Sequence, residues 1–422
     1  MLMNQLIKYF AKNNFYTDWK INSINDISNL NSDQLLTKYN ERFIFLFQKA
    51  YNKSPFYKEL YQKHGIQLND INDLNDIKKL PVVNRDMIKD RVEDIYNSFN
   101  FLKIIGLTSG TSGSPLTLFR TIFDISTEQA YIRHYRNSHG FSFGQPLLSI
   151  RGALGKNIPF ENFKKANTLY ISSPNINENT IEMYYSMIVK FKPRAIEAFP
   201  SYIFKLCFEL QKKGLELKVP IVFTSSETLY GFQREFVESY LGATIYDWYG
   251  NAERSILLAQ NNDLIYKPLP LYSINEFEKD HIITTNLINT SFPLIRYEVH
   301  DIVTLNSQGL INDNLNPDII SIEGRASENL LLKDGSVVGC IDHAFKGVKN
   351  LEIAQVHQYN VTDPLNIKIV VTASFSKTDE EQLKTNFIRM VGVETELKFT
   401  YCKREDLTFT KNKKYRLIIK NP

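Results

Sequence analysis

Residues 107–121 read LTSGTSGSPLTLFRT, and the interpretation of the whole chain starts from this stretch. Small hydroxylated residues alternate with Gly110 and Gly113, and Pro115 closes the run. A segment this poor in bulky side chains predicts neither a core strand nor a stable helix. Its backbone N–H groups and hydroxyls suit an anion, because glycines let the backbone turn toward a negative charge. A flexible Ser/Gly surface linker is the alternative interpretation.

Two well-known phosphate-binding patterns do not describe this loop. A Walker A loop requires a lysine followed by Ser or Thr after its last glycine, and no lysine lies in residues 107–121. The dinucleotide fingerprint GxGxxG is also absent from the sequence. The glycines and hydroxyls still suit an anion, and the loop by itself does not decide between a phosphate site and a surface linker.

Composition excludes several classes of function. The 422 residues are enough for two or three domains, and 50 basic residues are offset by 46 acidic ones for a net charge of +4. This balance indicates no nucleic-acid partner. The three cysteines lie far apart without a CxxC pair, which fits a reducing compartment. No apolar run approaches the roughly 20 residues of a membrane span, and the N-terminus lacks signal-peptide features, so we expect a cytoplasmic protein without a membrane partner.

Apolar periodicity predicts alternating strands and helices through the middle of the chain. A polar helical region with an interruption at Ser54-Pro55 comes first. Short apolar runs then alternate with segments of helical spacing, which favours α/β layers with parallel pairing. We expect strands within residues 146–152, 166–173, 193–200 and 220–227, and helices within 127–140, 179–191, 201–214 and 230–242.

After about Tyr246 the alternation of strand-like and helical segments ends. Strand-like runs follow, and beyond Gly324 comes a smaller unit with the pattern of an α+β domain. The chain ends in the basic segment TKNKKYRLIIKNP. In this last part we expect strands within residues 351–360, 366–375 and 395–405, and a helix within 379–392.

Five stretches in register carry a family resemblance. LTSGTSGSPL, YDWYGNAERS, LIRYEVHDIV, IEGRASENLLLKDGSVV and TKNKKYRLIIK occur in that order. They resemble the phosphate loop, the YGxxE, RYxxGD and GRxxD motifs, and the C-terminal GKxR-like segment of the adenylate-forming superfamily of acyl- and aryl-CoA ligases. SPFYKELYQKHGI and AFPSYIFKL resemble the phenylacetate-CoA ligase-like branch, which includes CapK-like members. The resemblance covers nearly the whole chain.

The resemblance implies a fold and a division into domains. It implies an α/β fold with a large N-terminal adenylation domain of layered sheets and helices, followed by a small mobile α+β lid. We expect the first domain over residues 1–324, where it binds ATP and the acid. The lid is expected over residues 325–422.

The resemblance also implies a function and its participants. A small-molecule carboxylic acid is activated by ATP to an acyl-adenylate and then transferred to coenzyme A. Two negatively charged reactants must meet, so charge neutralisation and positioning dominate the barrier. Mg²⁺ is implied as a cofactor, with coenzyme A as co-substrate.

The implied site residues fall into five groups. They are Thr108, Ser109, Gly110, Thr111, Ser112 and Gly113 for the phosphates; Ser225, Ser226, Glu227, Tyr249 and Gly250 for the adenine; Asp301 for the ribose, with Arg325 for the ribose or a phosphate; Glu253 for Mg²⁺; and Lys414 for the charge of the adenylation step. A carboxylate such as Asp301 can accept hydrogen bonds from both ribose hydroxyls. Mg²⁺ prefers oxygen ligands such as Glu253 beside phosphates.

Four positions depart from the family motifs. Ser114 stands where the family often has lysine, His300 and Lys413 stand where it has glycine, and Ser327 occupies the hinge carboxylate position. Lys411 is a competing assignment for the catalytic lysine.

Two other functions remain open from the sequence. The acyl-adenylate could pass to an amine of a sugar or an amino acid, as in polysaccharide decoration, or the fold could serve as a non-catalytic binding protein. The sequence does not identify the carboxylic acid that would be the substrate. Phe160, Phe163, Phe199 and Tyr202 would suit an aryl ring, although such residues are also ordinary core. The oligomeric state is not indicated either.

Overall fold

The protein is described by a computed structural model. It describes residues 9–96, 103–107, 116–151, 154, 159–227, 229, 231–278, 281–306, 315, 317–324, 330–333, 337–338, 341–345, 348, 350–371, 373–408 and 418–420. The chain divides into two compact units. The first comprises Met1–Leu107, Thr117–Val299 and Val303–Ile322, and the second comprises Thr108–Leu116, His300–Ile302 and Glu323–Pro422.

The first unit begins with helices whose ends are set by capping side chains. Asn31 caps α3 in a capping box with Gln34, and Ser54 ends α3 and caps α4, whose first residue is Pro55. The interruption expected at Ser54-Pro55 is thus a helix boundary. These helices are α2 (Phe15–Ser28), α3 (Ser32–Lys53), α4 (Pro55–Lys63), α5 (Arg85–Lys89) and α6 (Val92–Ile95).

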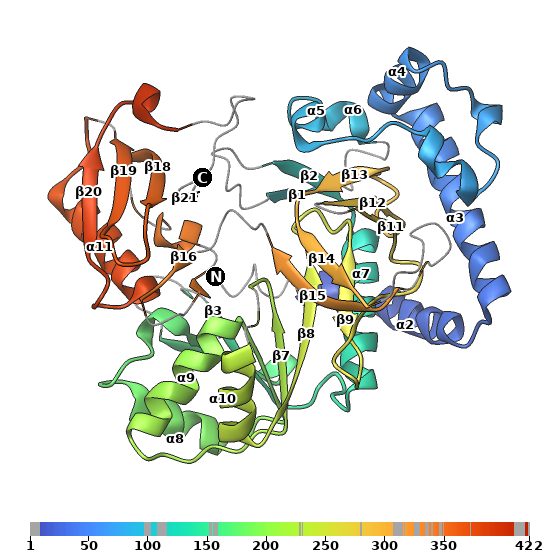
Figure 1. Cartoon of the computed structure of the whole chain (residues 1–422). Coiled ribbons are helices and arrows are strands. Elements are labelled where there is room, and N and C mark those ends of the chain that lie inside the picture. Colours follow the sequence, from blue (N-terminus) through green and yellow to red (C-terminus); the bar gives the residue numbers. More distant parts are fainter. Residues whose placement is uncertain are drawn as a thin grey trace. The chain divides into compact units, whose positions relative to one another are not determined.

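A ten-stranded mixed sheet forms the centre of this unit (Figure 1). Its order is β14-β15-β10-β9-β8-β7-β6-β3-β5-β4, and the consecutive neighbours β8, β7, β6, β3 and β5 pair in parallel. The strands are β3 (Leu147–Arg151), β4 (Phe160–Phe163), β5 (Thr168–Ser172), β6 (Ala195–Ala198), β7 (Ile221–Ser225), β8 (Thr244–Gly250), β9 (Leu257–Gln260), β10 (Tyr266–Pro268), β14 (Ile302–Leu305) and β15 (Ile319–Gly324).

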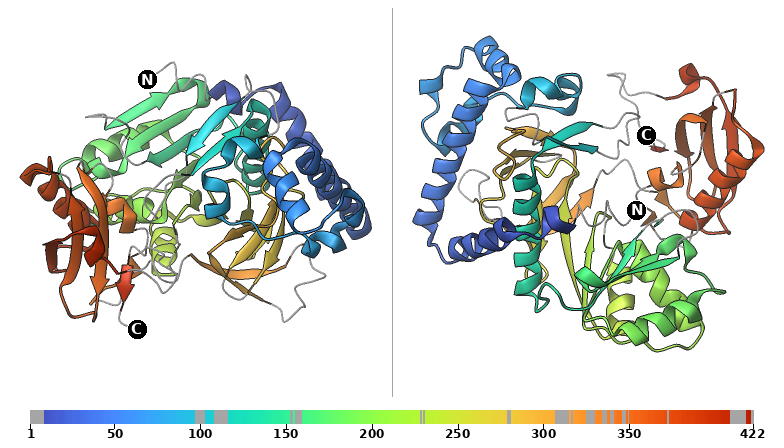
Figure 2. Two further views of the ribbon diagram at one scale, coloured as in Figure 1. Left: turned by 90° about the horizontal axis from the view of Figure 1, so that it is seen from above. Right: turned by 180° about the vertical axis from the view of Figure 1, so that it is seen from behind.

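Helices cover both faces of the parallel strands, and alternate residues of each strand face opposite layers. On β7, Val222 packs in the core with α8, α9 and α10, whereas Ile221 and Phe223 pack with Tyr135 of α7. Figures 1 and 2 show α7 on one face and the green helices α8 to α10 on the other. The bounds are α7 (Ile122–Ser138), α8 (Ile181–Phe191), α9 (Pro200–Lys212) and α10 (Gly231–Leu241).

Two smaller antiparallel sheets complete the first unit. One is a hairpin of β1 (Ile104–Leu107) and β2 (Thr117–Arg120), and the other joins β11 (Ser273–Phe277), β12 (Ile282–Asn286) and β13 (Tyr297–Val299). Arg296, just before β13, forms a buried ion pair with Glu276 of β11 at 2.9 Å. Its Nη1 also donates to the Leu80 carbonyl at 2.5 Å, which fastens the N-terminal segment to the small sheet.

The second unit has its own sheet and core. Its four strands lie in the order β20-β19-β18-β21, and α11 supplies Leu383 and Phe387 to the apolar core. Ser376 and Asp379 form the capping box that starts α11. The elements are β16 (Leu330–Leu331), β17 (Val337–Val338), β18 (Leu351–Gln358), β19 (Leu365–Val371), α11 (Lys377–Val391), β20 (Leu397–Tyr401) and β21 (Ile418–Lys420).

The α/β fold expected from the sequence is confirmed. Each of the four expected strands of the parallel region lies within its window, as do α8 and α10, whereas α7 starts five residues and α9 one residue before the expected window. The sequence analysis missed β4, β9 and β10, and it treated the end of the chain as a basic tail, whereas Ile418–Lys420 forms β21 parallel to β18. Among the described helices, none has the length and apolar character needed to cross a bilayer.

Candidate functional site

Eight of the fifteen implied site residues lie outside the described residues, and a ninth belongs to the second unit. Thr108 to Gly113, Arg325 and Lys414 lie outside the described residues, as do the departures Ser114, Ser327 and Lys413. Asp301 belongs to the second unit, where it is half-buried directly before β14, and its neighbour His300 is exposed. The remaining six residues belong to the first unit.

Five of these six lie at the carboxyl ends of two adjacent parallel strands. Ser225 ends β7 and is in register with Trp248 of β8, so Ser226 and Glu227 leave the sheet beside the end of β8, which is formed by Tyr249 and Gly250. Ser226 has φ +71, and its Oγ lies 3.3 Å from the Oγ of Ser225. Ligands of open α/β sheets bind at this edge, outside the carboxyl ends of the strands.

The turn after β8 explains the glycine of the YGNAE motif. A Cβ on Gly250 would lie 3.2 Å from the Ile256 carbonyl oxygen and 3.3 Å from the Trp248 ring. Asn251 closes the turn by accepting from the Ser255 N–H at 2.9 Å and donating to its hydroxyl at 2.7 Å. The backbone therefore approaches closely here and carries Glu253 on a fixed loop.

Glu253, the sixth residue, lies near a half-buried arginine, Arg120. The Tyr297 hydroxyl donates to Oε1 of Glu253 at 3.5 Å. Arg120, the last residue of β2, donates from Nη2 to the carbonyl of Ala252, the residue directly before Glu253. Arg120 also crosses Gly106 of β1, where a Cβ would lie 2.9 Å from its Nη1. Glycine at position 106 thus leaves room for the guanidinium.

Arg120 lies in a cluster of charged side chains of both signs. Burial and the neighbouring Arg254 together lower its pKa to about 10, while Glu128 and Glu253 oppose the shift. Arg254 is paired with Glu128 of α7 at 2.6 Å. The Nε of Arg120 has no hydrogen-bond partner within the described part of the chain. The formal charges of Arg120, Glu128, Arg254 and Glu253 cancel, but the Arg120 guanidinium keeps a hydrogen-bond donor without an acceptor in this part of the chain.

A second charged cluster lies on β6 and β3. Glu197 pairs with Arg136 at 2.9 Å and with Arg151, the last residue of β3, at 3.2 Å. Burial by itself would raise the pKa of Glu197, but the two guanidinium groups outweigh it and lower that pKa to about 2. Its carboxylate stays ionised at any physiological pH.

The sequence analysis did not identify Arg120, Glu128, Arg254 or Glu197 as site residues. Charges brought together from β2, α7, the β8 turn and β6 leave no local spacing in the sequence. The one available signal was that Arg254 directly follows the glutamate of the YGxxE-like motif.

The four aromatic residues considered for an aryl pocket do not form one group in the structure. Phe199 and Tyr202 stack with centroids 5.0 Å apart at the start of α9. Phe163 instead packs edge-on against Tyr9, and Phe160 is 40% exposed on β4. Only the Phe199–Tyr202 pair lies next to the carboxyl end of β6.

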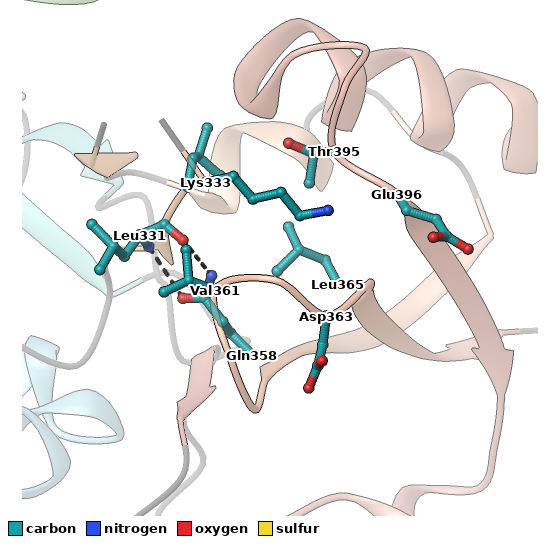
Figure 3. A pocket seen from close by; sticks show the side chains of 9 residues that line it. Leu331, Lys333, Gln358, Val361, Asp363, Leu365, Thr395 and Glu396 are labelled. Carbon is teal, nitrogen blue, oxygen red and sulfur yellow. Dashed lines mark hydrogen bonds between the residues drawn. The ribbon is translucent and has the colours of Figure 1, made fainter. Parts of the chain in front are cut away.

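The second unit contains a small pocket, drawn in Figure 3, that does not compete as a substrate site. Its volume is about 10 Å³, the space of one water molecule. Gln358 lines it and is bonded to the backbone of Leu331 in both directions, at 3.1 and 2.6 Å. Lys333, Asp363 and Glu396 also line it. Within the described residues of the whole chain, no three His, Cys, Asp or Glu side chains gather as a metal-binding group.

Comparison with known proteins extends over almost the full length of the chain. No family model matches it. Protein CapK of Staphylococcus aureus is 23% identical, covering 92% of this chain and 90% of CapK. Phenylacetate-coenzyme A ligase of Pseudomonas putida is 22% identical, covering 92% and 95%.

Solved structures give the same fold. 2-Hydroxyisobutyryl-CoA ligase in complex with 2-HIB-AMP and CoA has a TM-score of 0.60 at 17% identity, covering 93% of this chain and 91% of that one. The same ligase in the postadenylation state with R3-HIB-AMP has a TM-score of 0.56 at 16% identity, covering 93% and 90%. The curated relatives bear out the resemblance found in the sequence, to the phenylacetate-CoA ligase-like branch of the adenylate-forming ligases, and the solved structures share its fold.

Proposed function

We propose that this protein is an AMP-forming ligase that activates a carboxylic acid with ATP and transfers the acyl group to coenzyme A. The observation that carries the proposal is the convergence of Ser225, Ser226, Glu227, Tyr249 and Gly250 at adjacent carboxyl ends of parallel strands, with Glu253 on the following turn. The relatives named phenylacetate-coenzyme A ligase, and the ligase structures holding an acyl-AMP and CoA, support it.

The reaction has two steps. A carboxylate oxygen of the acid attacks the α-phosphorus of ATP, a P–O bond forms, and the bond to pyrophosphate breaks. The thiol of coenzyme A then attacks the acyl carbon, and AMP leaves. The first step brings two anions together, so cations and hydrogen-bond donors placed around the phosphates lower its barrier.

The residues at the strand ends fit the nucleotide. Tyr249 offers an aromatic face for the adenine, and the hydroxyls of Ser225 and Ser226 offer donors and acceptors to its edge. Glu253 would hold Mg²⁺ with the phosphate oxygens, since Mg²⁺ is usually held by one or two carboxylates and substrate phosphates. Asp301 and Arg325 are proposed for the ribose.

Arg120 is proposed as the cation that serves the phosphates where Ser114 replaces a lysine. Its guanidinium is held beside the loop of Glu253 by the Ala252 carbonyl, and its Nε faces no hydrogen-bond partner among the residues described. An arginine is suited to phosphate because its donors form a planar fork. Thr108 to Gly113 and Lys414 are proposed to supply the remaining donors and the positive charge for the reacting carboxylate.

We propose that the domains follow the sequence expectation, with the adenylation domain over residues 1–324 and a mobile lid over 325–422. The second compact unit, whose longest segment starts at Glu323, supports this division. In this scheme the lid brings Lys414 to the adenylation step and withdraws it for the transfer step.

ATP–pyrophosphate exchange without coenzyme A is the direct test. The protein is incubated with MgATP, labelled pyrophosphate and a panel of aryl, aliphatic and hydroxy acids. Exchange that depends on one acid class establishes adenylation and identifies the substrate, and Lys414→Ala is expected to abolish it while Lys411→Ala retains it. No exchange with any acid by the folded protein would favour the non-catalytic alternative.

The acceptor is tested in the same assay. Coenzyme A and then amino sugars and amino acids are added to the adenylating mixture, and the product is identified by mass spectrometry. Thioester formation supports the proposal. Amide formation without thioester would replace coenzyme A by an amine and point to polysaccharide or amino-acid modification.

A further inference from the structure

A second pocket of the first unit shares none of its residues with the candidate site. It has a volume of about 350 Å³, within the range of small-molecule pockets. Three helices and one loop build it. The lining residues are Tyr16 and Lys20 of α2; Arg42 and Phe45 of α3; Thr121, Phe123, Asp124 and Thr127 at the start of α7; and Leu287, Ile288, Thr290 and Ser291.

Two cations of this pocket have no carboxylate partner. Among the described residues, no carboxylate oxygen lies within 4.0 Å of the Lys20 ammonium or the Arg42 guanidinium, by contrast with the ion pairs elsewhere in the unit. Arg42 donates one hydrogen bond, from Nη1 to the Leu271 carbonyl, at 3.1 Å. Burial lowers the pKa of Lys20 to about 8, and the nearby Arg42 adds to this shift. The two side chains therefore place uncompensated positive charge in the pocket.

The one acidic side chain of the pocket is already engaged. Asp124 is buried and accepts from the Thr121 backbone N–H and hydroxyl, both at 2.7 Å, in the capping box of α7. Burial raises its pKa, which Lys49 and Ser291 oppose. The ammonium of Lys49 is itself held by the Thr290 hydroxyl at 3.3 Å. The charge of Asp124 is thus balanced by Lys49, so Asp124 does not neutralise the positive charges of Lys20 and Arg42.

Aromatic side chains from the same three helices also line the pocket, and Phe45 and Phe123 are exposed. Tyr16 packs edge-on against Phe123 with centroids 5.2 Å apart, and it is tilted against Trp19 at 5.4 Å. Phe45, Trp19 and Phe123 are 57%, 52% and 49% exposed. Rings this large are usually buried in a soluble protein, and a cluster of them beside two cations indicates a ligand with a flat apolar part.

We propose that this pocket binds a planar aromatic anion, in which one phosphate or carboxylate group is held by Lys20 and Arg42 and the ring lies against Tyr16, Phe45 and Phe123. The pocket is about the size of a single such molecule. The proposal does not rest on the adenylation chemistry and survives its failure.

Calorimetric titration with phenyl phosphate tests the proposal, with inorganic phosphate and phenol as the two halves of the probe. Phenyl phosphate is expected to bind about tenfold more tightly than inorganic phosphate, and phenol alone to bind too weakly to measure. Lys20→Gln and Phe123→Ala are each expected to weaken phenyl phosphate about tenfold. Lys53→Gln, an exposed lysine on α3, is the matched control and is expected to bind like the unaltered protein.

Three outcomes overturn the proposal. One is the absence of saturable binding at millimolar phenyl phosphate, and another is equal affinity in Lys20→Gln and Lys53→Gln. The third is weaker binding of phenyl phosphate by Arg120→Met, which would mean that the probe occupies the candidate nucleotide site instead. Thermal unfolding of each variant ensures that only folded protein is compared, and Arg42→Gln repeats the test independently of Lys20.

Discussion

Two arginine–glutamate clusters of the first unit use the same residue types but differ in how completely their charges are partnered. Arg296 is 9% exposed and directs all three of its guanidinium nitrogens to partners: Glu276 twice at 2.9 Å, and the Leu80 carbonyl at 2.5 Å. Among the residues that the structure describes, Arg120 donates one hydrogen bond, to the Ala252 carbonyl, and its Nε has no acceptor. A closed cluster holds the fold together, whereas an open one keeps binding capacity for a ligand.

Breaking the closed cluster is expected to give the largest effect on stability. Arg296→Leu would leave Glu276 buried without a counter-charge and free the Leu80 carbonyl, for a loss of about 3–5 kcal/mol in the free energy of unfolding. Urea unfolding followed by circular dichroism measures it. In the double variant Arg296→Leu with Glu276→Leu, much of the loss should return, because no uncompensated charge remains. A loss below about 1 kcal/mol in Arg296→Leu would show that the pair is not structural.

A buried acid on β8 sharpens the contrast between closed and open clusters. Asp247 accepts from the Thr224 and Tyr266 hydroxyls, both at 2.5 Å, and no cation in the described ranges forms an ion pair with it. Burial raises its pKa to about 6, against the two hydrogen bonds that lower it. An acid whose pKa is higher in the folded state stabilises the fold when protonated, so stability should fall as pH rises from about 4 to about 6.

Asp247→Asn removes this titration. The shift of about two pH units corresponds to about 3 kcal/mol, so the variant should lose most of the decline in stability between pH 4 and 7. Unfolding free energies measured at several pH values check it, with Asp263→Asn on an exposed turn as the control. An identical pH profile in Asp247→Asn and the unaltered protein would contradict the raised pKa.

Breaking the open cluster is expected to reduce ligand binding rather than stability. Arg120→Met keeps the length of the side chain and removes the charge, so we expect about a hundredfold lower kcat/KM for MgATP in pyrophosphate exchange. The free energy of unfolding should hold or rise, because burial beside Arg254 disfavours the charge. Direct titration with ATP provides a readout that does not depend on turnover.

The matched control for Arg120→Met is Arg194→Met, an arginine exposed before β6. If Arg120→Met binds ATP as tightly as this control but unfolds more easily, Arg120 belongs with Arg296 as a structural residue. The distinction between the two clusters would then be wrong.

Features that depend on neighbouring residues could be predicted from the sequence, whereas features that bring distant residues together could not. The parallel strands and their helices could be predicted because each is marked by a local run of apolar residues. Ile221, Val222 and Phe223, for example, indicate β7 without any information from distant parts of the chain. Glu253 and the residues Ser225 to Glu227 could be proposed because the motifs that carry them are local too, and the structure places Ser225 to Glu227 at the end of β7. β21 was missed because its two isoleucines follow a lysine-rich run, and only pairing with β18, some sixty residues earlier in the chain, makes it a strand.

The charge clusters could not be predicted in this way. Glu128 lies on α7 and Arg254 on the turn after β8, and neither has a charged partner at helical or strand spacing. Their meeting depends on the order of strands in the sheet, which periodicity does not specify. Motif resemblance located the strand ends, and the structure was required to show which charges surround them.

The cluster at Glu197 offers the smallest and most specific test, because it is closed by ion pairs but remains partly open to solvent. Arg136 and Arg151 lower the pKa of Glu197 to about 2, and its side chain is 22% exposed. A lowered acid pKa stabilises the fold above about pH 4.5 and loses that contribution as pH falls toward 2, opposite in sign to Asp247. Glu197→Gln should therefore cost about 1–2 kcal/mol at pH 7, reduced from the full shift by solvent screening, and almost nothing near pH 2. Unfolding free energies at pH 7 and pH 3 measure the difference. A cost that is equal at both values would assign Glu197 to packing, since only the ion pairs respond to protonation.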